Sequence, residues 1–120
     1  MGAPEGPPAV SIQALQPAHD PGTLIVLIRG GIERADAARV ADEVAGLIRA
    51  TGPQRLVCDV GGLIRPNAAT VDVVCRIRLA ARRVGCRLRL RGASPELVGL
   101  LDLMGLCDVV EDDSGLDGER

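Results

Sequence analysis

Residues 56–91, LVCDVGGLIRPNAATVDVVCRIRLAARRVGCRLRLR, decide the fold because they contain a strand, a helix and another strand in succession. Residues 56–60 are mostly apolar, which is typical of a buried strand. Residues 67–84 repeat apolar side chains at helical spacing, and residues 86–91 alternate strictly, as in a half-exposed strand. This unit predicts a right-handed crossover between two parallel strands.

The residues before this unit predict two more strands and one more helix. Residues 9–15 alternate between apolar and polar side chains, which is typical of an edge strand with one wet face. Residues 24–28, LIVLI, are continuously apolar and predict a strand that is buried on both faces. From about Glu33 apolar residues recur at helical spacing, and residues 51–53, TGP, end this helix.

The residues after this unit predict a third helix and a last strand. Ser94 is a capping residue, Pro95 takes the first helical position, and Gly105 ends the helix. Its buried stripe is expected to consist of Leu97, Leu100, Leu101 and Met104. Residues 107–110 predict a short strand. The complete order defines an α/β fold with a mixed, largely parallel central sheet of about five strands and three main helices.

The chain is expected to form one domain with a tail at each end. Its length of 120 residues fits a single domain. Residues 1–8 contain three prolines and two glycines and predict a flexible N-terminal tail, whereas residues 111–120 form an acidic C-terminal tail. The domain therefore covers residues 9–110.

The composition restricts both the core and the partners. The chain has no Phe, Trp or Tyr, so its core must be aliphatic, and all 14 basic residues are arginines, which suggests a bacterium with GC-rich coding. The net charge of −2 and the lack of aromatic residues argue against nucleic-acid or anionic-lipid binding. We expect a cytoplasmic protein, since the sequence shows no signal peptide and no membrane-spanning run.

Motifs of catalysis or cofactor binding are not apparent in the sequence. There is no phosphate-binding loop and no nucleophile elbow, and the single histidine, His19, lies in a loop rich in proline and glycine. The four cysteines contain no C-x-x-C pair and are expected to act as small apolar residues rather than metal ligands. We predict a protein that is not an enzyme and needs no cofactor or metal.

The helix at residues 67–84 has an outer face suited to binding another protein. Its predicted core face consists of Thr70, Val73, Val74, Ile77, Ala80, Ala81 and Val84. The opposite face carries an apolar strip, Val71, Cys75 and Leu79, which are spaced at i, i+4 and i+8 and surrounded by arginines. The predicted partner-binding residues are Val71, Cys75, Arg76, Arg78, Leu79 and Arg82. The alternative is a set of scattered surface apolar residues without function.

Charge is unevenly distributed along the chain. Seven arginines lie in the stretch 76–91, which contains no acidic residue, and the C-terminal tail holds five acidic residues. The basic stretch could face solvent, an acidic protein surface, nucleic acid or the acidic tail of this same chain.

Residues 56–74, LVCDVGGLIRPNAATVDVV, and residues 84–110, VGCRLRLRGASPELVGLLDLMGLCDVV, resemble the STAS domain of bacterial anti-sigma factor antagonists. The resemblance covers roughly residues 10–110. It implies a STAS-like fold and a regulator of transcription by partner switching, which binds an anti-sigma factor or a GHKL-type serine/threonine kinase. Family members carry an Asp-Ser-Ser-Gly-like motif at the start of the second helix, where one serine accepts phosphate.

This chain departs from the family at that motif. Asn67 stands in place of the aspartate, Ala68 and Ala69 replace the serines, and Thr70 falls at the glycine. The degenerate motif predicts an antagonist that binds its partner without the usual phosphorylation switch. Two alternatives stay open: a scaffold or assembly subunit that forms a homo-oligomer, and a small-ligand or nucleotide sensor.

Overall fold

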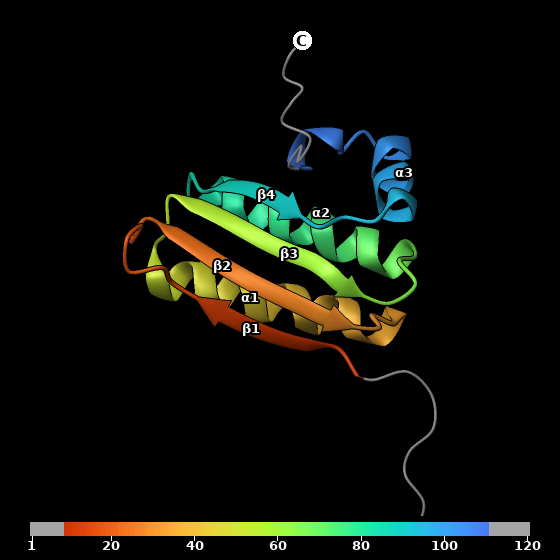
Figure 1. Ribbon diagram of the computed structural model, residues 1–120, viewed down its shortest axis with the longest axis horizontal. Coiled ribbons are helices and arrows are strands. Elements are labelled where there is room, and N and C mark those ends of the chain that lie inside the picture. Colours follow the sequence, from red (N-terminus) through yellow and green to blue (C-terminus); the bar gives the residue numbers. More distant parts are fainter. Residues whose placement is uncertain (1–8, 111–120) are drawn as a thin grey trace, which may run out of the picture.

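The computed structural model describes residues 9–110, so both predicted tails lie outside the described residues. Four strands, three α-helices and two 3₁₀ turns follow one another in the order shown in Figure 1. Their bounds are β1 Ser11–Leu15, β2 Thr23–Gly30, η1 Arg34–Asp36, α1 Ala37–Thr51, β3 Arg55–Leu63, α2 Ala68–Arg83, β4 Arg87–Arg91, α3 Pro95–Leu103 and η2 Cys107–Val109. Among these, no helix is long and apolar enough to cross a membrane.

The sheet has the strand order β1-β2-β3-β4. β1 pairs antiparallel with β2, whereas β2, β3 and β4 are parallel, so the sheet is mixed as predicted, with four strands instead of the expected five. The prediction of a strand at residues 107–110 is wrong. Residues 107–109 form the turn η2 instead, and the Val109 N–H donates to the Leu106 carbonyl. Val110 makes one isolated parallel bridge to Leu90.

The helices α1 and α2 cover the same face of the sheet (Figure 1). Both crossovers proceed in one direction across the sheet, and right-handed connections then place their helices on one side. Leu24, Val26 and Ile28 therefore face the helices and are buried, whereas Ile25 and Leu27 on the other face are only half-buried. The prediction that this strand is buried on both faces is wrong.

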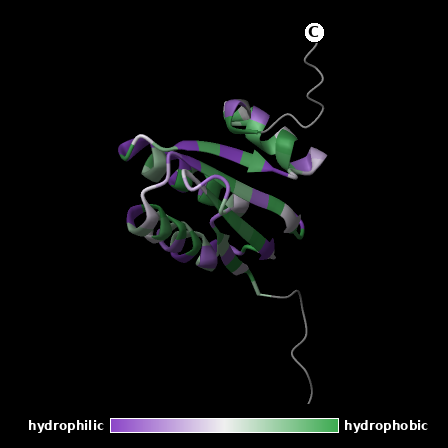
Figure 2. Cartoon of the chain, turned by 60° about the vertical axis from the view of Figure 1, so that its left-hand side comes forward, coloured by the Kyte–Doolittle hydropathy of each residue, from purple (hydrophilic) through white to green (hydrophobic). Residues whose placement is uncertain are grey.

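The core is aliphatic, as the composition requires. Figure 2 shows hydrophobic residues along the strands and on helix faces that turn toward them. The largest fully buried side chains include Leu24, Ile28, Leu56, Ile77 and Leu101.

Two residues predicted for core faces of helices are exposed instead. Val84 is 53% exposed and Met104 is 60% exposed. Each is the C-cap of its helix, so its backbone has left the helical path and its side chain no longer follows the helical face.

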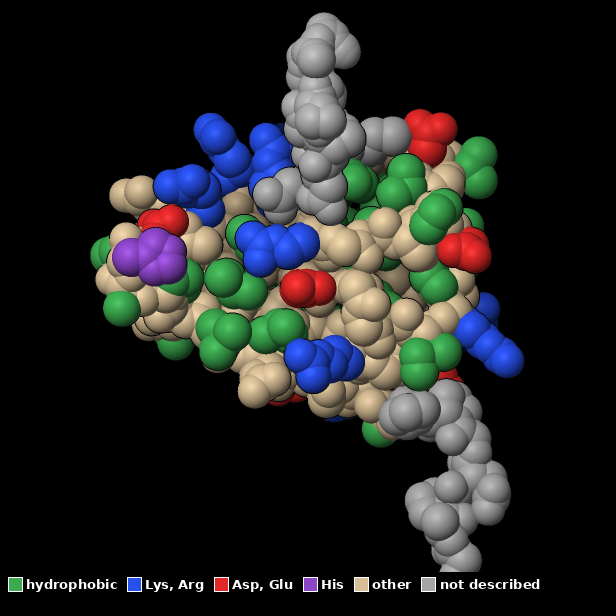
Figure 3. All heavy atoms as spheres, in the orientation of Figure 1, with side chains coloured by type: hydrophobic (Ala, Val, Ile, Leu, Met, Phe, Trp, Pro, Cys, Tyr) green, Lys and Arg blue, Asp and Glu red, His purple; other side chains and the backbone are tan. Residues whose placement is uncertain are grey.

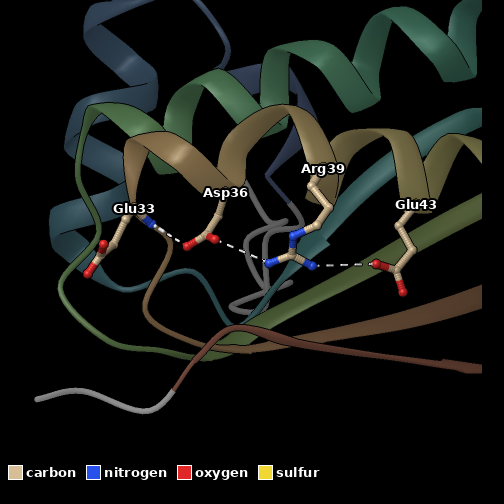
Figure 4. A network of polar contacts seen from close by, with 4 residues as sticks. All are labelled: Glu33, Asp36, Arg39 and Glu43. Carbon is tan, nitrogen blue, oxygen red and sulfur yellow. Dashed lines mark hydrogen bonds and ion pairs between the residues drawn. The ribbon is translucent and has the colours of Figure 1, made fainter. Parts of the chain in front are cut away.

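The start of α1 is held by a chain of polar contacts (Figure 4). The Asp36 carboxylate accepts a hydrogen bond from the Glu33 N–H at 3.1 Å and pairs with Arg39 at 3.2 Å. Arg39 also lies 3.8 Å from Glu43. These contacts lower the pKa of the Asp36 carboxyl, first through the Glu33 N–H and then through Arg39.

Candidate functional site

The first turn of α2 is closed by a reciprocal pair of hydrogen bonds. The Asn67 side-chain oxygen accepts from the Thr70 N–H at 3.1 Å, and the Asn67 N–H donates to the Thr70 hydroxyl at 3.2 Å. Asn67 also donates through its Nδ2 to the Ile32 carbonyl at 3.3 Å, which ties this turn to the loop after β2. This capping box satisfies helix-end groups that would otherwise lack partners.

The residues of the degenerate motif present no accessible hydroxyl. Thr70 is 2% exposed, as the helical geometry predicted, and its hydroxyl lies 3.3 Å from the Asn67 carboxamide oxygen. Ala68 is exposed and Ala69 half-buried, but both carry only a methyl group. Ser94, the next hydroxyl-bearing residue along the chain, caps α3 by accepting from the Leu97 N–H at 3.2 Å.

An apolar groove of about 310 Å³ lies between the N-terminal half of α2 and α3. We call it the α2–α3 groove, and its lining residues are Ala68, Val71, Asp72, Cys75, Leu100, Leu103 and Met104. Leu103 is 82% exposed, although it is a large aliphatic residue. Val71, expected on the wet face, is only 7% exposed and forms part of the groove wall instead.

The contribution of α3 to this groove was missed from the sequence. The helical spacing of α3 predicts a buried stripe that includes Leu100 and Met104 and leaves out Leu103. The composition of α3 held a usable signal, since six of the eight residues 97–104 are apolar. A surface helix needs only one apolar stripe to face the core, so this excess indicated a second apolar surface.

The predicted partner-binding residues on α2 divide among three surfaces rather than one. Cys75 lines the α2–α3 groove. Arg76 and Leu79 lie in a groove of about 370 Å³ between α1 and α2, and Leu79 is 54% exposed. Arg78 and Arg82 face a third groove of about 430 Å³ beside β4. Because a helix turns about 100° per residue, side chains that are close in the sequence of α2 point toward three different grooves.

The cysteines that the structure describes are free thiols. Cys58 and Cys86 are buried, and burial raises the pKa of both, that of Cys58 to about 12 with a smaller contribution from Cys86. Thiols with a raised pKa hold little of the nucleophilic thiolate at neutral pH. Within residues 9–110 no three potential ligand side chains gather closely enough to hold a metal ion.

The chain is thus a small α/β domain with both crossover helices on one face and an apolar groove at the start of the second. It belongs to the STAS domain family, since the family model described as "Mlab, STAS domain" matches residues 15–111. No curated protein matches the sequence.

Several solved structures share this fold. The anti-sigma factor antagonist SpoIIAA in its unphosphorylated form has a TM-score of 0.68 at 14% identity, with 89% of this chain and 94% of that chain covered. An anti-sigma factor antagonist from Mycobacterium paratuberculosis has a TM-score of 0.65 at 16% identity, with 91% and 92% covered. The STAS domain of an antisigma-factor antagonist from Rhodobacter sphaeroides has a TM-score of 0.57 at 22% identity, with 74% and 96% covered.

Proposed function

We propose that this STAS domain regulates transcription by binding an anti-sigma factor or a GHKL-type serine/threonine kinase at the α2–α3 groove. The observation that carries the proposal is the apolar lining of the groove together with the exposure of Leu103 and Met104, at 82% and 60%. Large apolar side chains that lie together on a protein surface mark a site that another protein covers. The shared fold with solved anti-sigma factor antagonists supports the kind of partner.

The rim of the groove adds polar groups that would orient the partner. Asp72 lines the groove and pairs with Arg76 at 3.0 Å, one helical turn further along α2. Exposed charges at a rim contribute more to the rate and orientation of association than to affinity. The outward residues Arg76 and Leu79 would extend the contact along α2 if the partner reaches the α1 side.

Binding is proposed to be independent of phosphorylation. A kinase needs a hydroxyl that reaches its active site, whereas the Thr70 hydroxyl is buried and hydrogen-bonded within the capping box. A phosphate near this turn would add nearly two negative charges at the groove. Since Ala68 and Ala69 cannot carry one, the surface remains apolar.

The proposal is tested by affinity capture with the full chain from a lysate of the organism that encodes it, followed by mass spectrometry. We expect an anti-sigma factor or a GHKL-type kinase to co-elute, and Leu103→Glu to reduce its recovery at least tenfold, since a buried charge costs more than about 1.4 kcal/mol. Leu15→Glu is the matched control, because Leu15 is 49% exposed on β1, away from the groove.

Three outcomes would contradict the proposal. One is capture that contains neither class of partner, and another is equal recovery with Leu103→Glu. The third is a stable homo-oligomer in light scattering that Leu103→Glu dissociates, since the groove would then hold a second copy, as expected of an assembly subunit. Loss of binding in Leu79→Glu alone would place the partner in the groove between α1 and α2 instead.

A further inference from the structure

A second surface, on the β4 side of the molecule, is defined by four arginines. Arg78 and Arg82 come from successive turns of α2, and Arg87 and Arg89 come from β4. They surround a groove of about 430 Å³, which we call the arginine groove. Its wall on the third side is formed by Asp108 and Val109 of η2. In Figure 3 arginine side chains gather at the upper left, over the beginning of β4.

The positive charge of the arginine groove is only partly balanced. Asp108 pairs with Arg78 at 3.0 Å, and its backbone carbonyl accepts a hydrogen bond from Arg89 at 2.6 Å. Within residues 9–110 neither Arg82 nor Arg87 has an acidic side chain within ion-pair distance. Like charges gathered around a groove repel one another unless an anion lies among them.

The acidic C-terminal segment begins at this same groove. Val109 lines it, and Val110 bridges to Leu90 of β4, so Glu111 follows directly from the wall of the groove. Residues 111–119, EDDSGLDGE, contain five acidic residues and no basic residue. Nine residues of extended chain span up to about 30 Å. The segment can therefore reach all four guanidinium groups.

We propose that residues 111–119 dock in the arginine groove of their own molecule. Asp108, just before this segment, already contacts two of the arginines. Its carboxylate pairs with Arg78, and its backbone carbonyl accepts a hydrogen bond from Arg89. The acidic side chains that follow continue the pairing to Arg82 and Arg87. Docking holds η2 against the edge strand β4 and closes the groove to other anions. Since the pairs are exposed, salt weakens them and the segment is released at high ionic strength.

The experiment is ¹⁵N relaxation of the full-length protein at low salt, which reports the order parameter of each backbone amide. We expect values of about 0.85 for residues 111–113, as in the folded body, and a fall below about 0.6 in the double variant Arg82→Ala/Arg87→Ala. The control is Arg49→Ala/Arg83→Ala, which removes the same charge from the groove between α1 and α2. It should leave residues 111–113 ordered.

A reciprocal variant tests the contact from the other side. Replacing Glu111→Gln, Asp112→Asn and Asp113→Asn together should shift the side-chain Nε–H resonances of Arg82 and Arg87, and leave those of Arg49 and Arg83 in place. Order parameters below about 0.6 for the whole segment in the unaltered protein would overturn the proposal. So would ordering that rises with protein concentration, or inorganic phosphate that shifts Arg82 and Arg87 equally with and without the acidic residues.

Discussion

Asn67 and Thr70 hold each other across the first turn of α2, each giving its backbone N–H to an oxygen of the other's side chain, at 3.2 and 3.1 Å. The same two residues occupy the ends of the motif at which STAS antagonists accept phosphate, as the family resemblance implies. The Thr70 hydroxyl is thus buried and engaged in holding the first turn of α2.

The hydroxyl of Thr70 is expected to contribute to stability. Thr70→Val keeps the shape of the side chain but leaves the Asn67 N–H without its acceptor. We expect the free energy of unfolding to fall by about 1–2 kcal/mol, the usual cost of a lost cap or an unsatisfied buried donor. The measurement is urea unfolding followed by far-UV circular dichroism, since the chain has no Trp or Tyr. Thr70→Ser retains the hydroxyl and should preserve the hydrogen bond, so equal losses in both variants would refute this role.

A negative charge at Ala68 should separate stability from partner binding. Ala68 is exposed, occupies the first position of α2 and lines the α2–α3 groove. Ala68→Asp places a carboxylate at the positive end of the helix and should raise stability by about 0.3–1 kcal/mol. The same charge should reduce recovery of the partner in the capture experiment. Ala68→Asn is the neutral control, and stronger binding of Ala68→Asp than of Ala68→Asn would contradict the proposed apolar docking surface.

Two glycines are expected to respond oppositely to alanine. Gly92 has φ +76°, and an added Cβ would lie 3.1 Å from the Cα of Gly61, so Gly92→Ala should destabilise the protein by about 1–2 kcal/mol. Gly99 lies within α3 with nothing within 4 Å of an added Cβ. Gly99→Ala should therefore stabilise it by about 0.5–1 kcal/mol. Thermal or urea unfolding compares the pair directly, and changes of the same sign would contradict the prediction.

The contacts of Asp36 predict how the start of α1 responds to acid. The Glu33 N–H and the Arg39 guanidinium lower the pKa of Asp36 below its ordinary value of 3.8. These contacts stabilise the native state above that value, and their contribution is lost as the pH falls through the lower, folded pKa. In an NMR titration, Arg39→Ala should raise the pKa of Asp36 without fully restoring it, because the Glu33 N–H remains.

Glu43→Gln is the control for this titration. It removes the other partner of Arg39, which lies 3.8 Å away, but touches neither of the groups that lower the Asp36 pKa. An unchanged Asp36 pKa in Arg39→Ala would show that the ion pair of Figure 4 does not persist in solution.

The sequence alone predicted the strands and helices that have strong local signals. Ser94 and Pro95 at the start of α3, and Gly52 at the end of α1, carry capping chemistry that acts within a few residues. Thr70 could likewise be placed in the core, because a helical face follows from spacing alone.

Features that depend on the third dimension were not predictable in this way. The continuous apolar run of β2 would look the same whether helices cover one face of the sheet or both. The number of covered faces depends on the directions of the two crossovers, which are the same here. The α2–α3 groove depends on the direction that α3 takes after β4. The spacing of apolar residues in the sequence does not define this direction. Val84 and Met104 were wrongly predicted to be buried. Both fit the helical spacing of apolar residues, but each is a C-cap, where the helix has already ended.

β1 stands apart from the other strands, since it belongs to neither crossover and four of its five residues are exposed. Removing it from the sheet would uncover one edge of β2 and disturb little of the core that β2, β3 and β4 share with the helices. Proteins open in cooperative units whose free energies follow the apolar surface that each unit buries. The backbone amides of β1 should therefore exchange their hydrogens with solvent when β1 alone separates from the sheet, at a low cost in free energy. The amides of β3 should exchange only when the whole domain unfolds.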